Sequence, residues 1–163
     1  MRAHLLMPIC FLTMLSSVAF ADQLQGLVRV TGNAPFKQVT ITKPSEFVGM
    51  SLCPGVKAKR ILNLESLVVK IYGGEKTLGA SKCFEIGSFT VLKTPAGNDA
   101  IVGTLLEKDG ALQILAEDGR TVRLADVPAG LRNMLGKKVV VDIKPEAALT
   151  SGAFQAVYYA EFP

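Results

Sequence analysis

A cysteine followed by several cations is the stretch of this sequence whose residue types could do chemistry. Residues 52–60 read LCPGVKAKR, in which Cys53 precedes a Pro-Gly pair. The cations that follow it are Lys57, Lys59 and Arg60. A cysteine can ligate a metal, take part in redox chemistry or form a disulfide, and clustered cations can bind an anion. The compartment of the protein and its other residues decide between these chemistries.

The first 21 residues have the parts of a secretory signal peptide. Arg2 supplies the positive start, residues 5–15 are almost entirely apolar, and Ala-Phe-Ala at 19–21 is a small-x-small cleavage site. We therefore expect cleavage before Asp22 and a periplasmic or secreted protein. The apolar run is too short to span a bilayer, and no other stretch approaches about 18 apolar residues, so we expect no transmembrane segment after cleavage. A retained N-terminal anchor is the alternative.

Removal of this segment would also remove the only histidine, His4, and one of the three cysteines, Cys10. The remaining chain has no histidine and no tryptophan, which excludes Ser-His-Asp and Cys-His catalysis and imidazole metal sites. Exactly two cysteines in an exported chain predict one disulfide, between Cys53 and Cys83. The pair lacks the C-x-x-C spacing of a redox motif and has no further soft ligands, so we expect no cofactor and no metal. Free thiols are the alternative.

The predicted disulfide closes a loop with 29 residues between the cysteines. On the chain-entropy model such a loop stabilises the folded chain by roughly 3–4 kcal/mol. That contribution matters for a small domain, whose core alone leaves little margin.

The charge balance argues against nucleic acid as a partner. Residues 22–163 contain 17 Lys and Arg against 14 Asp and Glu, a net charge of +3 that is too mild for a nucleic-acid binder. The basic excess lies in the first half, where residues 22–99 contain 10 basic and 6 acidic residues. No aromatic platform accompanies these cations, and export would separate the protein from cytosolic nucleic acid.

The three cations after Cys53 have two interpretations. If residues 56–61 are extended, Lys57 and Lys59 lie on one face and Arg60 on the other, so they form no single clamp. They then either form an anion-binding patch for phosphate, lipid headgroups or acidic glycan, or line a solvated edge that discourages strand pairing. Whether this segment is a strand, or a loop that leads into half a turn of helix, stays open.

The second half of the chain reads as a small β domain. Residues 101–107, 111–117 and 121–125 are rich in β-forming residues, and Asp-Gly pairs at 109–110 and 118–119 separate them as hairpin turns. A short helix is expected between Asp126 and Gly136. Two further strands, 138–143 and 154–162, complete the pattern.

Three strands, a short helix and two strands, with Gly103 early in the first strand, resemble the OB-fold, a five-stranded Greek-key barrel. The first half repeats this plan, since Gly26 occupies the position of Gly103 and FEIGSFTVL at 84–92 echoes FQAVYYAEF at 154–162. We therefore predict an all-β chain with one or two short helices, folded as two tandem five-stranded OB-like barrels. The predicted boundaries are 1–21 for the signal peptide, 22–94 for the first barrel, 95–99 for a linker and 100–163 for the second barrel.

A signal peptide followed by OB-like modules resembles exported bacterial OB-fold proteins, including small periplasmic stress-associated ones. The resemblance covers the order of elements over residues 24–163 and transfers no functional residue. The small members of that group have one barrel, so a second barrel departs from their pattern. One continuous sandwich or barrel is the alternative architecture.

These observations predict a non-catalytic exported binding protein that recognises another protein or a component of the cell envelope. The first alternative is an anion-binding module that uses the basic first half. The second is a hydrolase built on carboxylates, for which Glu107 with Asp109, and Glu117 with Asp118, are the only close pairs considered. All four residues stand at hairpin ends, where acidic turn formers are common. The sequence identifies neither the partner nor the oligomeric state.

Overall fold

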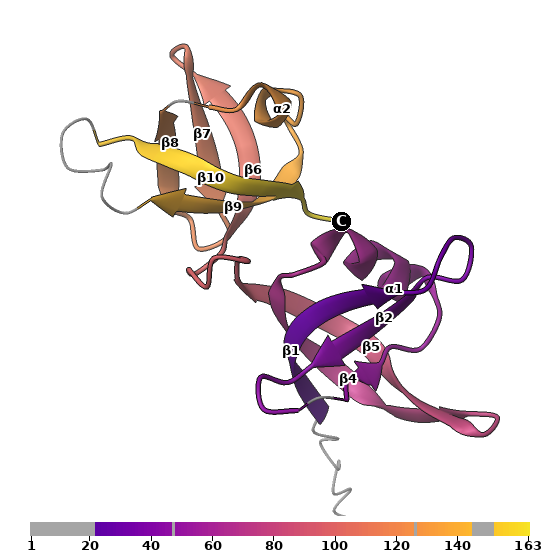
Figure 1. Ribbon diagram of the computed structural model, residues 1–163. Helices are drawn as coiled ribbons and strands as arrows, with labels where there is room; N and C mark the ends of the chain where they lie inside the picture. The colour runs from indigo at the N-terminus through magenta and orange to yellow at the C-terminus, as the bar shows by residue number, and fades with distance from the viewer. Residues whose placement is uncertain (1–21, 47, 126, 145–151) are drawn as a thin grey trace, which may run out of the picture.

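The structure, a computed structural model, describes residues 22–46, 48–125, 127–144 and 152–163. Its ten strands are β1 Asp22–Thr31, β2 Gln38–Thr42, β3 Met50–Ser51, β4 Val68–Leu78, β5 Ser81–Lys93, β6 Ile101–Lys108, β7 Ala111–Ala116, β8 Thr121–Ala125, β9 Lys138–Lys144 and β10 Phe154–Glu161. Two short α-helices, α1 Val56–Ile61 and α2 Ala129–Arg132, and the 3-10 turn η1 Leu62–Leu64 accompany them. The described chain is therefore mostly β, as the residue patterns predict. Figure 1 shows it as two halves joined end to end.

The second half is a closed five-stranded barrel, which confirms the prediction for this half. Its strands follow the order β10-β8-β7-β6-β9, and β10 also pairs with β9. Parallel pairing of Phe154 with Leu124 closes the barrel between β10 and β8. The tight turn at Asp109 and Gly110, both with positive φ, joins β6 to β7 as the Asp-Gly signal predicts. Helix α2 is shorter than expected, and residue 126 lies outside the described residues.

The first half has the same order of elements but an open sheet. Its strands run β3-β2-β1-β4-β5, and the two edge strands are not joined into a ladder. They approach at one isolated parallel bridge, between Leu52 and Phe84, where the Cys53 amide donates a 3.0 Å hydrogen bond to the Phe84 carbonyl. A second closed barrel, predicted from the repeat, is therefore not confirmed.

Residues 56–61 are neither the third strand nor a loop, the two alternatives from the sequence. They form helix α1, whereas the third strand, β3, precedes Cys53 and contains only two residues. Ile61 at the end of α1 is fully buried in the core of the first half. Burial of this residue fixes the helix, because α1 has no side-chain cap and no acidic residue in its first turn.

Gly26 and Gly103, the glycines that the repeat places in equivalent positions, are required to be glycine for the same steric reason. A Cβ on Gly26 would collide with the carbonyl of Thr42, and a Cβ on Gly103 would collide with the carbonyl of Leu115. In each half the strand that contains this glycine pairs with neighbours on both sides. The glycines therefore allow the close backbone approach on which each sheet depends.

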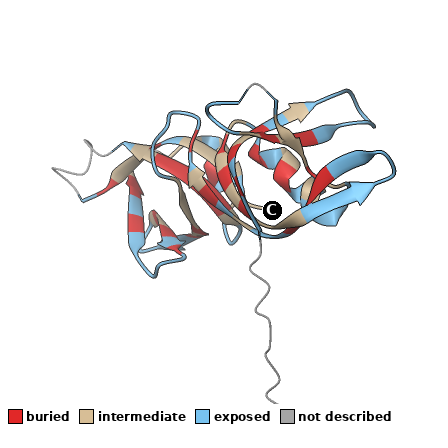
Figure 2. Cartoon of the chain, turned by 90° about the horizontal axis from the view of Figure 1, so that it is seen from below, coloured by how far each residue is buried: buried red, intermediate tan, exposed pale blue. Residues whose placement is uncertain are grey.

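The two halves share a packed junction. Val140 belongs to β9 of the second half, yet it is fully buried in the core cluster of the first half. Asp142, also on β9, has 0% exposure and accepts hydrogen bonds from Thr94 Oγ1 at 2.6 Å and from Asn98 Nδ2 at 3.1 Å. Figure 2 shows buried positions along the strands of both halves, with exposed residues at the hairpin tips. The connection after β5 is thus fixed to the second half.

No helix in the described part of the chain has the length and apolar character needed to cross a membrane.

Candidate functional site

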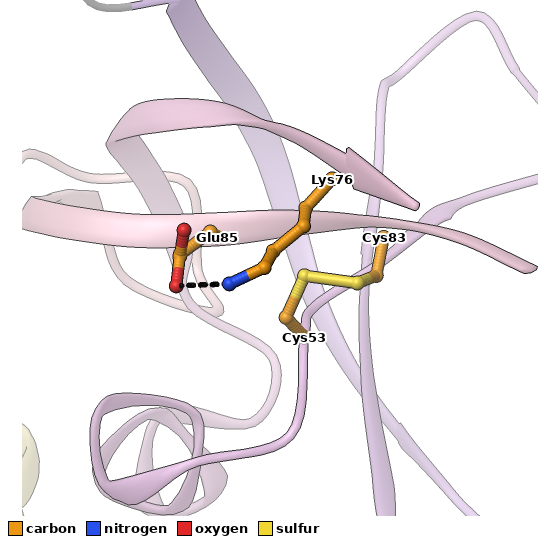
Figure 3. Close-up of a disulfide and its surroundings, with 4 residues drawn as sticks. All are labelled: Cys53, Lys76, Cys83 and Glu85. Carbon is orange, nitrogen blue, oxygen red and sulfur yellow. Dashed lines mark hydrogen bonds and ion pairs between the residues drawn. A yellow bond between two sulfur atoms is a disulfide. The ribbon is translucent and has the colours of Figure 1, made fainter. Parts of the chain in front are cut away.

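The Cys53–Cys83 disulfide, predicted from the cysteine count, is present and joins the β3 segment to β5, the two edges of the open sheet. The S–S distance is 2.08 Å, and Cys83 lies on β5 beside the residue of the isolated bridge. Figure 3 shows Cys53 on the loop that leads to α1, with the Lys76–Glu85 ion pair next to the disulfide. A covalent bond therefore holds β3 and β5 together where hydrogen bonding is sparse.

Pairing between the β3 segment and β5 stops directly after the disulfide. Pro54 has no backbone N–H and cannot continue a ladder, and Gly55 leads the chain into α1. From Glu85 to Val91, strand β5 pairs with β4 alone in the described residues. The other edge of β5 faces α1 and is left without a partner strand.

The three cations after Cys53 do not act as one patch. Helix α1 places Lys57 and Arg60 three residues apart on one face, whereas Lys59 lies on another. Lys57 and Arg60 together line a pocket of about 360 Å³, and Lys59 lines a separate pocket of about 350 Å³. The arrangement expected for an extended segment, with Lys57 and Lys59 together and Arg60 apart, does not apply because residues 56–61 are helical.

Two adjoining pockets follow the open edge of β5. One, of about 470 Å³, lies between residues 53–58 and the β4–β5 ladder and includes Gly74 and Glu85. The other is the pocket of Lys57 and Arg60, which extends from residues 87–91 of β5 to the second half. The two pockets share Lys57 and Gly87, so together they form one groove, called the β5-edge groove below.

The far end of the β5-edge groove is built by the second half. Phe89 of β5 stacks on Phe162, with ring centroids 5.4 Å apart. Lys138 lies over the Phe162 ring, 4.3 Å from its centroid, and forms an ion pair with Glu117. Lys138 and the aromatic pair are functional candidates that the sequence did not single out, because only the junction of the halves brings them together.

The charges in the groove are unevenly neutralised. Glu85 and Glu117 are each already paired with a lysine, Lys76 and Lys138 respectively. Lys57 donates a 2.6 Å hydrogen bond to the Gly87 carbonyl and forms no ion pair among the described residues. Arg60 likewise has no ion-pair partner in the parts of the chain that the structure covers. Lys57 and Arg60 therefore supply the uncompensated positive charge of the groove.

A second feature lies on the opposite side of α1. The pocket of about 350 Å³ there is lined mainly by apolar groups, with Lys37 and Lys59 as its cations. Phe36, in the loop between β1 and β2, has 83% of its surface exposed, and Val56 at the start of α1 has 71%. Phe36 lies in the sequence between Pro35 and Lys37, which line this pocket, called the Phe36 pocket below, whereas Val56 lines the pocket of about 470 Å³. Phe36 was not predicted as a candidate, and its loop position gives no signal in sequence alone.

The carboxylates considered for hydrolysis do not meet. Glu107 and Asp109 lie at one end of β7, whereas Glu117 and Asp118 lie at its other end, and all four are exposed. The backbone N–H of Arg120 and then its guanidinium hold the pKa of Asp118 below its usual value. The geometry thus places these residues on hairpin ends and not in a shared pocket. Over the residues that the structure describes, no group of three or more His, Cys, Asp and Glu side chains is placed to hold a metal ion.

Comparison of the chain with protein-family models, with curated proteins and with solved structures found no match.

Proposed function

We propose that the protein is a non-catalytic, exported binding protein that recognises another protein or a component of the cell envelope. In this proposal both halves are OB-like barrels. The edge strands of the first meet only at the bridge between Leu52 and Phe84 in the described residues, and the disulfide beside that bridge supports an OB-like arrangement of this half. The signal-peptide pattern of residues 1–21 supports export, and the disulfide is consistent with an oxidising compartment.

The observation that carries the proposal is the Phe36 pocket. A phenylalanine with 83% exposure gains nothing for folding, and its sequence neighbours Pro35 and Lys37 line a mainly apolar pocket of about 350 Å³. Aromatic side chains that insert into a partner, next to an apolar pocket with a cationic rim, are the usual anchors of protein interfaces. This surface therefore has the composition of a docking site on the first half.

Photocrosslinking tests this proposal. A photoreactive amino acid replaces Phe36 in the full chain, and a matched protein has it in place of Glu107, an exposed residue on β6 of the second half. Irradiation in intact cells is expected to give a discrete adduct from position 36 and none from position 107. Equal adducts from both positions, or none from 36, would refute a docking role for this surface. Mass spectrometry of the recovered protein tests export, with Asp22 expected as the first residue.

Anion binding is the second candidate function, and one observation favours it. Arg60, Lys57 and Lys138 converge on the pocket at the end of the β5-edge groove, although the first two come from the helix and the third from the other half. Calorimetric titration with inorganic phosphate at low and moderate salt tests it. Affinity for phosphate that falls steeply with salt, and that disappears in Arg60→Ala, is the expected result. The absence of measurable heat at low salt would exclude this function.

A further inference from the structure

The open edge of β5 is a second candidate interaction surface. Residues 85–91 have a strand on one side only, with a β-bulge at Gly87, so the backbone N–H and C=O groups that point away from β4 face the β5-edge groove. At roughly 3.3 Å per residue, this edge is about 20 Å long. Proteins normally pair, cover or charge such an edge, because it is a template for another strand.

The position of Lys57 shows that the edge can accept a donor. Its ammonium group lies 2.6 Å from the Gly87 carbonyl, where the N–H of an added strand would otherwise donate. Lys57 is exposed and the bond is held by a flexible side chain, so its replacement by a backbone N–H costs little net free energy. The lysine closes the edge in the free protein and leaves it available to a competing strand.

The length and chemistry of the groove limit what fits. Adjoining pockets of about 470 and 360 Å³ run along the edge, which suits an extended segment of about six residues and not a helix. Lys57 and Arg60 supply positive charge that no ion pair within the described residues neutralises, and the stacked Phe89–Phe162 pair forms an apolar wall at the far end. An extended peptide with alternating acidic and apolar side chains complements both features.

We propose that the β5-edge groove binds an extended acidic peptide segment of a partner protein, which adds a strand to the open edge of β5. The peptide backbone pairs with residues 85–91, its acidic side chains meet Lys57 and Arg60, and an apolar side chain contacts the aromatic wall. This inference rests on the proposed binding role but uses a different surface from the Phe36 pocket.

A synthetic peptide tests the proposal on the full protein. The probe is a capped hexapeptide that alternates glutamate and valine, and its binding is followed by calorimetry and by amide hydrogen exchange. Binding with new protection of amides in residues 85–91 is the expected result. A peptide of the same sequence that is N-methylated at alternate residues is expected to bind at least about tenfold more weakly, because it cannot form the ladder.

Matched variants test which cations contribute to peptide binding. Arg60→Glu is expected to weaken peptide binding about tenfold or more, because it reverses a charge in the groove. Lys59→Glu makes the same change one residue away, outside the groove, and should leave the affinity within about twofold. Gly74→Leu provides a steric test, since a Cβ there meets no atom within 4 Å and the larger side chain projects into free space at the groove. It should block binding while the unfolding midpoint stays unchanged.

Three results would overturn the proposal. Equal binding of the N-methylated peptide, or peptide binding that inorganic phosphate abolishes at constant ionic strength, would show a simple anion site without strand addition. Self-association of the protein through residues 85–91 that excess peptide cannot reverse would assign the edge to a second copy. Absence of binding at millimolar peptide would exclude this class of ligand. None of these results affects crosslinking at position 36, so failure here and failure of the proposed function are distinguishable.

Discussion

Two neighbouring cations of this chain lie on different surfaces because both belong to a six-residue helix, which points adjacent side chains in different directions. Lys59 and Arg60 are adjacent in sequence, yet one lines the Phe36 pocket and the other the β5-edge groove. The pattern of cations marks the segment as a candidate site, but the backbone conformation decides which cations lie together. The partners of Arg60 in the groove, Lys138 and the aromatic pair, are distant in sequence. No local signal could have revealed them.

Glycines give the sharpest prediction at the scale of single residues. Gly26→Ala places a Cβ against the Thr42 carbonyl, and since backbone must move, a loss of about 1–3 kcal/mol in unfolding free energy is expected. Gly74→Ala, also on a strand of the first half, meets no atom within 4 Å and should be neutral or stabilising by about 0.5 kcal/mol. Urea denaturation of the two variants checks this. A similar loss of stability in both would contradict the steric explanation.

Elements with strong local signals could be predicted, and those fixed by tertiary contacts could not. Strand β8, Thr121–Ala125, has the bounds expected from its alternating residues and the Asp-Gly turn before it. In contrast, β3 has two residues and α1 has neither a capping side chain nor an acidic first turn, so neither gives a recognisable pattern. Their positions depend on burial of Ile61 and on the disulfide. The open edge of β5, and with it the candidate site, follows from these two unpredicted elements.

At the scale of elements, we predict the effect of removing the Cys53–Cys83 disulfide. Replacement of Cys53 and Cys83 by serine should lower the unfolding free energy by roughly 3–4 kcal/mol, because the unfolded chain regains the freedom of a long loop. Among the described residues only one bridge otherwise joins the β3 segment to β5, so exchange of amides in the first half should increase first. Hydrogen exchange and urea denaturation of the double variant measure both effects. Unchanged exchange near residues 50–53 and 83–86 would contradict a role in joining the two edges.

At the scale of the whole molecule, the halves are coupled by residues of the second half that pack against the first. Val140 of β9 completes the first core, and Phe162 at the end of β10 stacks on Phe89. The connecting residues, predicted as a linker at 95–99, are held by the buried Asp142. The repeat in the sequence predicts two similar halves, but it contains no information on how they pack. The groove at their junction therefore escaped prediction.

Thr94 tests this coupling. Thr94→Val removes the hydroxyl that donates a 2.6 Å hydrogen bond to Asp142 and leaves a fully buried carboxylate with one fewer donor. A loss of about 1–3 kcal/mol in unfolding free energy is expected, and Thr94→Ser, which keeps the hydroxyl, should recover most of it. Thermal and urea denaturation of both variants give the comparison. Equal stability of the valine and serine variants would show that the hydrogen bond contributes nothing.

Alkaline pH tests the same junction through Tyr158. Burial raises the pKa of the Tyr158 phenol above its ordinary value of 10.0, and the ring packs against the core of the first half. The folded state therefore favours the neutral phenol. Its contribution to stability is present below about pH 10 and is lost as the pH rises through the raised pKa. Between about pH 9 and 11 the wild type should lose more stability than Tyr158→Phe, which has no ionisable group at this position. Urea midpoints at the two pH values measure the difference, and parallel losses in both proteins would show that the phenol is not buried at the junction in solution.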